Sequence, residues 1–244
     1  MNEEQKTVVL TGASRGIGHA TVKRFNDAGW RVLTCSREVF DSRCPWPGGK
    51  KNHIQVDLSD PKSTIEATDE IKDKLDGKLC ALINNAGVSP KLVDGQRLNS
   101  LETELKIWHQ VFQVNFFAPI LLAKALKNEL ERAKGAIVNV TSIAGSRVHP
   151  FAGAAYSTSK SALATLTREM AYDFGPLGVR VNAIAPGEVQ TNMLSEGTDK
   201  IVAGLPLGRI GQPSEVADAI YFLCSASSSY MTGSELSING GQHV

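Results

Sequence analysis

Short apolar segments alternate with longer amphipathic segments along most of the chain. The short segments are rich in Val, Ile and Leu and predict strands at residues 7–10, 31–35, 53–56, 79–83, 136–141, 180–184 and 235–238. The longer segments predict helices at residues 16–28, 61–75, 101–134, 152–174 and 213–225. Because strands and helices that alternate in this way build a mostly parallel sheet, the pattern predicts a doubly wound α/β fold with helices on both faces.

Two segments interrupt this alternation. Residues 39–51 contain two prolines and two glycines, which predicts a loop in place of a helix between the second and third strands. Residues 190–212 contain several glycines and few strand signals, which predicts a mobile substrate flap.

Length and charge limit the class of protein. A chain of 244 residues fits a single domain over 1–244, because one layered core grows to about this size before a chain divides. The 26 basic residues nearly balance the 25 acidic ones, which gives no support for nucleic acid or an anionic membrane as a partner. The four cysteines lie far apart without paired metal-ligand spacing, so we expect reduced thiols and no metal site.

The ends of the chain and its apolar runs bear on its location. The polar segment from Met1 to Lys6 lacks the apolar stretch of a signal peptide. No apolar run approaches the roughly 20 residues that a membrane-spanning helix needs. We therefore expect a cytoplasmic protein.

A glycine-rich turn joins the first predicted strand to the first predicted helix. Residues 11–18 read Thr-Gly-Ala-Ser-Arg-Gly-Ile-Gly, and the glycines Gly12, Gly16 and Gly18 let the backbone bend and approach a pyrophosphate. The spacing matches neither the G-x-G-x-x-G fingerprint nor a phosphate loop that ends in Gly-Lys-Ser/Thr. The turn therefore predicts a nucleotide site and disfavours kinase chemistry.

Three further features carry candidate chemistry. Residues 84–87, Asn-Asn-Ala-Gly, follow the fourth strand at the edge where open α/β sheets bind ligands, although a simple turn explains this motif equally well. Ser142 follows the fifth strand. Tyr156 and Lys160 lie four residues apart on a predicted helix, so they face the same cleft.

Taken together, these motifs resemble those of the short-chain dehydrogenase/reductase family, of the Tyr-x-x-x-Lys type. The resemblance covers nearly the whole chain and rests on the glycine turn, residues 84–87, Asn115, Ser142, Tyr156 with Lys160, and Pro186-Gly187. It implies a Rossmann-like, seven-stranded sheet and hydride transfer between a nicotinamide cofactor and a carbonyl or secondary alcohol substrate.

The resemblance also assigns roles to the catalytic candidates. A Tyr with an ordinary pKa of about 10 exchanges protons poorly near pH 7, and we expect the Lys160 ammonium to lower the pKa of Tyr156. Tyr156 then donates a proton in reduction or accepts one in oxidation, while Ser142 orients the substrate oxygen. The resemblance implies that Lys160 also holds the nicotinamide ribose and that Asn115 holds a water in a proton relay behind it.

The cofactor-binding residues come from the same motifs. The expected set is Gly12, Ser14, Arg15, Gly16, Ile17, Gly18, Arg37, Asp57, Leu58, Asn84, Ala86, Gly87, Tyr156, Lys160, Pro186, Gly187, Val189 and Thr191. In this set Asp57 and Leu58 resemble the family's adenine contact, and Asp57 is also a candidate helix N-cap. Val189 and Thr191 resemble the stretch that binds the nicotinamide carboxamide.

The end of the second strand bears on the choice between NADP and NAD. An acidic side chain there marks NAD, because it bonds the ribose 2′-hydroxyl and repels a 2′-phosphate. In this chain the position falls on Ser36, and Arg15 and Arg37 offer two guanidiniums for a phosphate. We therefore expect NADP. Glu38 keeps NAD open, since a register shift of two would bring its carboxylate to the ribose.

The sequence describes the substrate pocket without naming the substrate. The expected lining is Ser89, Leu92, Ile143, Arg147, His149, Phe151, Glu188, Met193 and Leu194. Arg147 or His149 could recognise an anion, but positions on the rim or surface are favoured for both. The helices predicted at 101–134 and 152–174 have longer apolar faces than one sheet covers, and relatives pair these helices, so we expect a homotetramer.

Two alternative functions remain open. One is 3-oxoacyl-[acyl-carrier-protein] reductase, since residues 11–18 resemble theirs, although residues 168–173 are mixed in charge where an acidic carrier protein favours a basic face. The other is a non-catalytic dinucleotide-binding regulatory protein. The complete set of Asn115, Ser142, Tyr156 and Lys160 speaks against it, because a binding module needs no proton donor.

Overall fold

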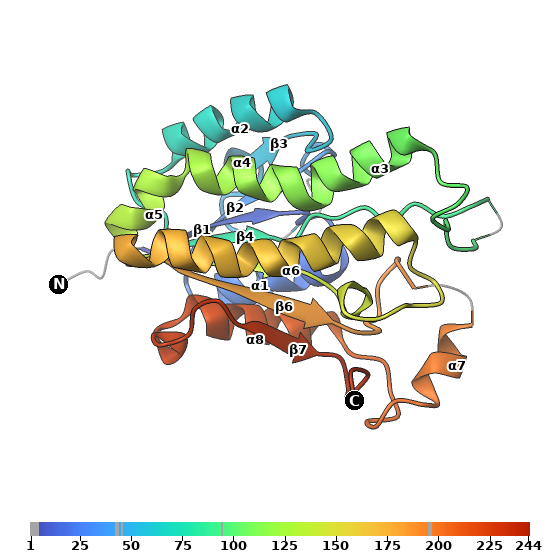
Figure 1. The fold of residues 1–244 in the computed structure, drawn as a ribbon. Helices are drawn as coiled ribbons and strands as arrows, with labels where there is room; N and C mark the ends of the chain where they lie inside the picture. The colour runs from blue at the N-terminus through green and yellow to red at the C-terminus, as the bar shows by residue number, and fades with distance from the viewer. Residues whose placement is uncertain (1–4, 42–43, 45, 94, 195–196) are drawn as a thin grey trace.

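In the described part of the chain, seven parallel strands form one sheet in the order β3–β2–β1–β4–β5–β6–β7. The computed structural model describes residues 5–41, 44, 46–93, 95–194 and 197–244. The strands are β1 (Thr7–Thr11), β2 (Arg31–Ser36), β3 (His53–Gln55), β4 (Ala81–Asn84), β5 (Ala136–Val140), β6 (Arg180–Pro186) and β7 (Glu235–Ile238). The strand order reverses between β1 and β4, so the predicted doubly wound, Rossmann-like fold is confirmed (Figure 1).

Helices cover both faces of this sheet (Figure 1). One face carries α2 (Pro61–Lys74), α4 (Ala118–Ala125), α5 (Lys127–Ala133) and α6 (Ala154–Phe174), and the other carries α1 (Gly16–Asp27) and α8 (Pro213–Cys224). Strand side chains alternate between the two cores, since Val9 joins the first core while Val8 and Leu10 join the second. The strands are apolar on both sides for this reason, which made them recognisable in the sequence.

Short helical turns complete the connections between these elements. They are η3 (Ile143–Gly145), η4 (Gly175–Leu177) and η5 (Ala226–Ser228). None of the helices in the described residues combines the length and apolar composition needed to cross a bilayer.

Local sequence explains the ends of α1 and α2. Gly29, at φ +77°, follows α1 in the left-handed conformation that favours glycine. Asp60 caps α2, because its side chain accepts from Lys62 N at 2.9 Å. The alternative role of Asp57 as this cap is wrong, because its Oδ1 accepts instead from the backbone N–H and the hydroxyl of Ser59.

The helix predicted over residues 101–134 begins late and is interrupted at two places. α3 (Leu105–Phe112) begins late, because Asn99 Oδ1 accepts from the backbone N–H groups of Leu101 and Glu102 and holds them in a turn. A π-helical turn, η2 (Gln113–Phe117), then joins α3 to α4. Leu126, at φ −98° and ψ 13°, separates α4 from α5. The apolar positions in the sequence continue across these interruptions, so their periodicity does not predict where the helix breaks.

The two segments that interrupt the predicted alternation, residues 39–51 and 190–212, lie at the predicted positions. Within 39–51, the described residues contain helical structure only at the start of a short 3-10 turn, η1 (Gly49–Asn52). The segment 190–212 also contains a short helix, α7 (Thr198–Val202), and its base is closed where Gln190 N donates to Gly211 O at 2.9 Å. Residues 1–4 of the polar N-terminal segment, residues 42–43 and Pro45 of the loop and residues 195–196 of the flap lie outside the described residues.

Candidate active site

A cavity of about 320 Å³ lies at the carboxyl ends of the strands. This is the edge at which open α/β sheets bind ligands. The predicted site residues that line it are Gly12, Ser14, Arg15, Gly16, Ile17, Gly18, Arg37, Asp57, Leu58, Ala86, Gly87, Ser142, Tyr156, Lys160, Pro186, Gly187, Val189 and Thr191. Two further predicted residues, Asn84 and Asn115, do not line it. The fold thus gathers motifs that are far apart in the sequence.

The glycine turn brings α1 into close contact with the end of β1. A Cβ atom on Gly18 would lie 2.1 Å from Gly12 O, so only glycine allows this approach of helix and turn. Gly12 N donates to Cys35 O at 2.9 Å, which ties the turn to the end of β2. The turn is therefore fixed by backbone contacts on both of its sides.

The N-terminus of α1 opens into the cavity without a cap. Arg15 stands at the N-cap position and makes no side-chain capping hydrogen bond, and the first turn contains no acidic residue. The first N–H groups of the helix and its positive dipole end are thus available to an anion. The residues present fit the pyrophosphate of a dinucleotide.

Residues 84–87 are joined to the glycine turn through Asn85. The Asn85 amide donates to the carbonyl oxygens of Thr11 and Gly12 at 2.9 and 3.0 Å. The sequence predicts a cofactor contact for Asn84, but this residue is 3% exposed, and its Nδ2 donates to Asn139 Oδ1 at 2.8 Å. β4 extends to Asn84 and turns its side chain into the sheet interior. Thr11 and Asn85 belong to the two predicted motifs, but the sequence assigned neither of them a role in the site.

Ser142, Tyr156 and Lys160 meet in the cavity from the end of β5 and the first turns of α6. The Ser142 hydroxyl lies close enough to the Tyr156 phenol to oppose the rise of its pKa. Lys160 is 3% exposed, and its Nζ donates to Val140 O at 2.6 Å and lies 5.8 Å from the centre of the Tyr156 ring. A hydroxyl pair therefore lies beside a buried amine.

Burial governs the protonation of Tyr156 and Lys160. Burial raises the pKa of Tyr156, the nearby Ser142 hydroxyl opposes this rise, and the Glu188 carboxylate adds to it. Burial lowers the pKa of Lys160 from 10.5 to about 8. The sequence predicts a lowered pKa for Tyr156, but the direction in this structure is the opposite, because burial of the phenol is the largest influence and Lys160 Nζ is engaged with Val140 O. Near pH 7 Tyr156 is thus a neutral phenol, the form that can donate a proton.

Asn115 lies on the π-helical turn η2 and is fully buried. Its Oδ1 accepts from Val88 N at 2.9 Å, and its Nδ2 donates to Val88 O and to Ser159 Oγ, both at 3.0 Å. A Cβ atom on Gly87 would lie 3.4 Å from Lys160 Nζ and 3.5 Å from Asn115 Oδ1, so both groups face this glycine. Asn115 therefore links residues 84–88 to the helix that carries Tyr156 and Lys160.

The end of β2 forms another part of the cavity wall. Ser36, Arg37 and Glu38 all line the cavity, and Ser36 Oγ donates to Glu38 O at 3.0 Å. The two hydrogen bonds from Ser59 lower the pKa of Asp57, and the nearby Arg37 charge adds to this effect. The guanidinium of Arg37 and the carboxylate of Glu38 can thus both contact a ligand at the end of β2.

Residues 186–191 form the opposite wall and are held by backbone contacts. Gly187 N donates to Ile238 O at 3.1 Å. A Cβ atom on Gly16 would lie 3.0 Å from Thr191 Cγ2, so Thr191 rests against the glycine turn. The wall therefore connects the glycine turn to the base of the segment 190–212.

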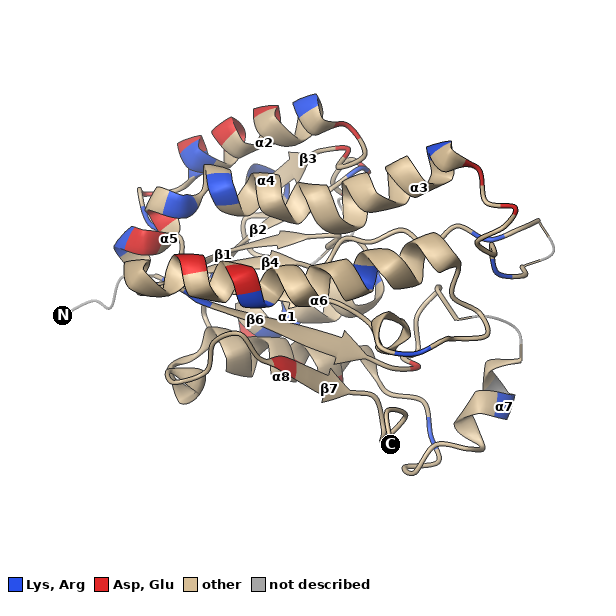
Figure 2. Cartoon of the chain, viewed as in Figure 1, with Lys and Arg blue, Asp and Glu red and all other residues tan. Residues whose placement is uncertain are grey.

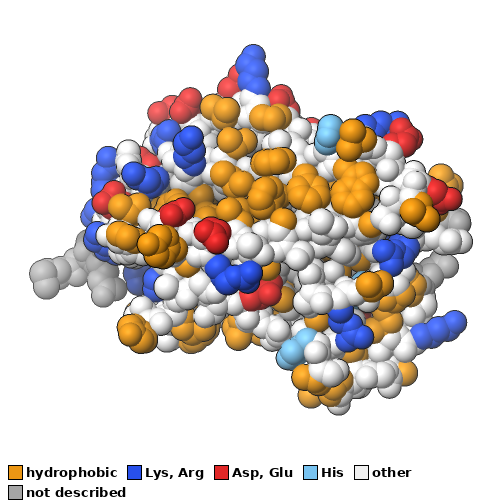
Figure 3. Space-filling view, in the orientation of Figure 1, with side chains coloured by type: hydrophobic (Ala, Val, Ile, Leu, Met, Phe, Trp, Pro, Cys, Tyr) orange, Lys and Arg blue, Asp and Glu red, His pale blue; other side chains and the backbone are white. Residues whose placement is uncertain are grey.

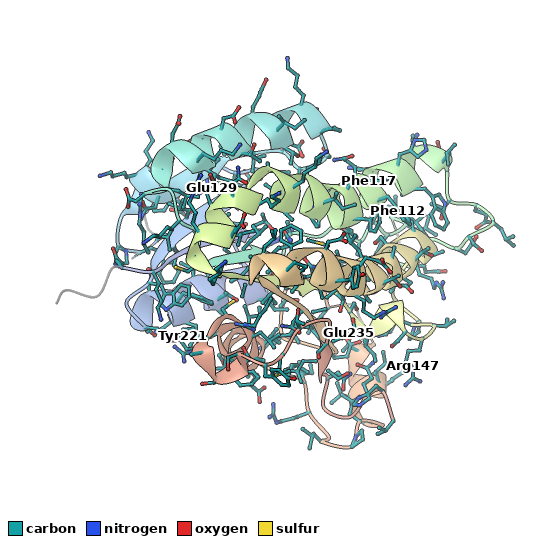
Figure 4. All side chains as sticks on the ribbon, turned by 60° about the vertical axis from the view of Figure 1, so that its left-hand side comes forward. Phe112, Phe117, Glu129, Arg147, Tyr221 and Glu235 are labelled. Carbon is teal, nitrogen blue, oxygen red and sulfur yellow. The ribbon has the colours of Figure 1, made fainter. Side chains whose placement is uncertain are left out.

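The substrate end of the cavity contains most of its predicted lining. Ser89, Ile143, His149, Phe151, Glu188, Met193 and Leu194 line it, whereas Leu92 and Arg147 do not. Arg147 is exposed, as predicted, and its guanidinium donates to Gln242 O near the C-terminus (Figure 4). The rim or surface position predicted for His149 is wrong, because His149 is buried and its Nε2 lies 2.6 Å from Glu188 Oε1. Among the described residues, no group of three or more His, Cys, Asp and Glu could hold a metal ion.

The fold and the cavity are those of a nicotinamide-dependent oxidoreductase. A family model described as enoyl-(acyl carrier protein) reductase matches residues 12–243, and the chain belongs to the short-chain dehydrogenase/reductase family. An oxidoreductase of this family from Brucella ovis, solved in complex with a partially ordered NAD, is 60% identical. The match covers 97% of this chain and 100% of that chain, with a TM-score of 0.84.

Two curated relatives are similar over nearly the whole chain. Protein FixR from Bradyrhizobium diazoefficiens is 59% identical over 244 residues, which cover 99% of this chain and 88% of that protein. Meso-2,3-butanediol dehydrogenase from Serratia marcescens is 34% identical over 248 residues, which cover 99% of this chain and 96% of that protein. The chain is therefore an NAD(P)-dependent oxidoreductase that interconverts carbonyl and alcohol groups.

Proposed function

We propose that Tyr156 is the proton donor and acceptor of this reaction, with Ser142, Lys160 and Asn115 as its partners. The observation that carries the proposal is that Ser142, Tyr156 and the buried Lys160 line one cavity, with Lys160 Nζ 5.8 Å from the centre of the Tyr156 ring. Ser142 orients the substrate oxygen, and Tyr156 gives its proton to that oxygen as the alkoxide develops. Lys160 supplies a positive charge that favours the phenolate left behind, and Asn115 supports Lys160 from behind Gly87.

A bound nicotinamide dinucleotide supplies the hydride in reduction and accepts it in oxidation. We propose that the predicted cofactor-binding residues that line the cavity hold it. The glycine turn and the uncapped end of α1 hold the pyrophosphate, Asp57 and Leu58 the adenine, and Val189 and Thr191 the carboxamide. Lys160, with its remaining ammonium donors, holds the nicotinamide ribose.

Replacement of the phenol tests the proposed acid–base role. We expect Tyr156→Phe to lower kcat for ketone reduction by about 10²- to 10⁴-fold, because general acid catalysis contributes this much. Affinity for the reduced cofactor, measured by its fluorescence, should change by less than about threefold, because the ring remains. A variant that reduces ketones at the wild-type rate would remove Tyr156 from the mechanism.

We propose NADPH as the preferred cofactor. The proposal is supported by Ser36 at the end of β2, where NAD users carry an acidic residue, and by Arg15 and Arg37 on the same cavity wall. NADH is the second candidate, supported by Glu38 in the wall and by the NAD bound to the Brucella ovis relative.

Paired titrations with NADPH and NADH decide between these cofactors. We expect wild type to bind NADPH at least about tenfold more tightly, and Arg37→Ala to lose about tenfold for NADPH alone, because a charge-assisted phosphate contact is removed. Lys23→Ala, at an exposed residue of α1, is the control. Tenfold tighter binding of NADH by wild type would overturn the NADPH proposal.

The acyl-carrier-protein alternative is supported only through the carrier protein in the name of the matched family model, because that name refers to an enoyl and not to a 3-oxoacyl group. Against it, both signs of charge alternate on the exposed end of α6, where an acidic partner needs a basic face (Figure 2). Rates of reduction of a 3-oxobutanoyl thioester and of simple ketones distinguish the acyl-carrier-protein reductase from a reductase of small carbonyl compounds. If neither is reduced and Tyr156→Phe changes nothing, the protein is the non-catalytic dinucleotide binder.

We propose further that the chain acts as a cytoplasmic homotetramer and that segment 190–212 is a substrate flap. The tetramer is supported by hydrophobic side chains that gather in a band over α3 and α4 (Figure 3). The location is supported by four free cysteines. The flap is supported by Thr191, Met193 and Leu194, which line the cavity from its first residues.

A further inference from the structure

His149 and Glu188 form a buried pair at the substrate end of the cavity. They come from different parts of the chain, His149 from the loop between η3 and α6 and Glu188 from the loop after β6. Each side chain is 10% exposed, and His149 Nε2 lies 2.6 Å from Glu188 Oε1. Both residues line the cavity that contains Ser142 and Tyr156. The pair therefore faces the space that a substrate occupies.

The hydrogen bonds of His149 determine which ring nitrogen carries the proton. Phe151 N donates to His149 Nδ1 at 3.3 Å, so Nδ1 acts as an acceptor and carries no hydrogen. The proton is then on Nε2, which donates to Glu188 Oε1. The ring thus uses Nδ1 as an acceptor and Nε2 as a donor, and Glu188 Oε1 is committed to the ring.

The carboxylate keeps one oxygen for a ligand. Among the described residues, no hydrogen-bond donor contacts Glu188 Oε2, although the side chain is nine-tenths buried. Among the described residues, Oε2 is not one of the enclosed side-chain atoms that lack a partner, so it is open to the cavity and can accept from a ligand. Its charge also contributes to the raised pKa of Tyr156, which is consistent with its nearness to the reacting groups.

The loop does not need this side chain for its own position. Glu188 O accepts from Gly211 N at 2.8 Å, and Gly187 N donates to Ile238 O at 3.1 Å. These backbone contacts hold the segment on both sides of the residue. The buried carboxylate is thus better explained by recognition than by the support of the loop.

We propose that Glu188 is a specificity-determining residue that accepts a hydrogen bond from a hydroxyl or ammonium group near the reacting carbon of the substrate. His149 is its positioning residue, because it fixes Oε1 and leaves Oε2 toward the cavity. The substrate class is then a hydroxylated or aminated ketone, or the corresponding diol or amino alcohol. This inference rests on the proposed function, since it assigns the substrate of the same site.

Matched ketones test this assignment in steady-state kinetics. The probes are 2-butanone, 3-hydroxy-2-butanone and 3-amino-2-butanone, each offered with NADPH and with NADH. We expect Glu188→Gln to lower kcat/KM for the hydroxylated or the aminated ketone by about ten- to hundredfold, mainly through KM, because a hydrogen bond to a charged acceptor is lost. The value for 2-butanone should change by less than about threefold. Glu66→Gln, at an exposed residue of α2, is the control.

Variants of His149 test its positioning role. We expect His149→Phe to impair the same ketone as Glu188→Gln does and to spare 2-butanone. His149→Gln should recover part of the loss, because an amide N–H can still donate to Oε1. The effects of His149→Phe and Glu188→Gln should not add in the double variant, since both remove one interaction.

The outcomes separate this inference from the proposed function. Reduction of all three ketones by wild type, with equal losses for all three in Glu188→Gln, would overturn the inference and leave the proposed function intact. If wild type reduces none of the three ketones, the inference is tested by calorimetry with the cofactor bound, independently of the proposed function. Tighter binding of 2,3-butanediol than of 2-butanol, abolished in Glu188→Gln, would then support it, and equal binding in wild type would overturn it.

Discussion

Lys160 places a positive charge where only 3% of the residue is exposed. Its pKa of about 8 still leaves it protonated near pH 7, although burial favours the neutral amine. Among the described residues, Nζ donates to Val140 O, and two of its three donors remain for a ligand. The buried ammonium of Lys160 is thus available for the reaction but lowers the free energy of unfolding of the protein.

Replacement of Lys160 should show how much the buried ammonium lowers the free energy of unfolding. The pKa of Lys160 is about 8 in the folded protein and 10.5 for an ordinary lysine, so the unfolded chain binds the proton more tightly. This difference lowers the free energy of unfolding of wild type, and the full reduction is present below pH 8. We expect Lys160→Met to abolish activity and to raise the free energy of unfolding at pH 7 by about 1–3 kcal/mol. The gain should shrink as pH rises from 8 to 10.5.

Urea denaturation at pH 7 and near pH 10 measures this effect. Lys62→Met serves as the control, because the Lys62 side chain is 84% exposed and carries no such penalty. A Lys160→Met protein that is less stable than wild type at pH 7 would show that the bond to Val140 O outweighs the burial of the charge.

At the scale of elements, segment 190–212 joins two rigid parts of the fold. Its base is fixed by the bridge between Val189 and Gly211. Beyond the base, Arg209 contacts both carboxylate oxygens of Glu215 at 2.6 and 2.9 Å, near the start of α8. The first residues of the segment line the cavity, so a bound ligand should restrict the whole of it.

Limited proteolysis should report this restriction. Lys200 is exposed on the short helix α7 and offers a trypsin site within the segment. We expect saturating NADPH or NADH to slow cleavage after Lys200 by about tenfold or more, because the ligand stabilises the closed segment. The fragments are identified by mass spectrometry, and cleavage of an unrelated protein in the same mixture checks the protease. An unchanged rate would separate the segment from ligand binding.

At the scale of the molecule, an aromatic band covers the outer side of α3, η2 and α4 (Figure 3). Trp108, Phe112, Phe116 and Phe117 form a chain of ring contacts there, with centroids 5.2–6.4 Å apart. Phe112 and Phe117 are labelled in Figure 4. Leu105 and Phe117 remain 67% and 46% exposed. A contiguous apolar surface of this kind marks a contact with another protein, and a second copy of this chain is the partner that we propose.

A charge in this band should dissociate the assembly. We expect Phe117→Glu to reduce the mass from that of a tetramer to that of a dimer or monomer, because a buried unpaired carboxylate is costly at an interface. Light scattering after gel filtration measures the mass. Ile65→Glu is the control, since Ile65 is 52% exposed on α2, outside the band. A monomeric wild type at every concentration would contradict the tetramer.

The sequence by itself determined the order of strands and helices and the position of the glycine turn. It also determined that Tyr156 and Lys160 share a helix face. These features depend on local spacing: strands buried on both faces are continuously apolar, and residues four apart on a helix point the same way. The cofactor class and the catalytic candidates follow from such patterns and their resemblance to a family.

Only the tertiary structure decided which neighbours each polar group meets. It turned Asn84 into the sheet and left Asn85 at the glycine turn, and it reversed the expected direction of the Tyr156 pKa. It also paired His149 with Glu188, 39 positions apart in the sequence. Burial and hydrogen bonding between distant segments depend on how the chain packs, and no local spacing encodes that packing.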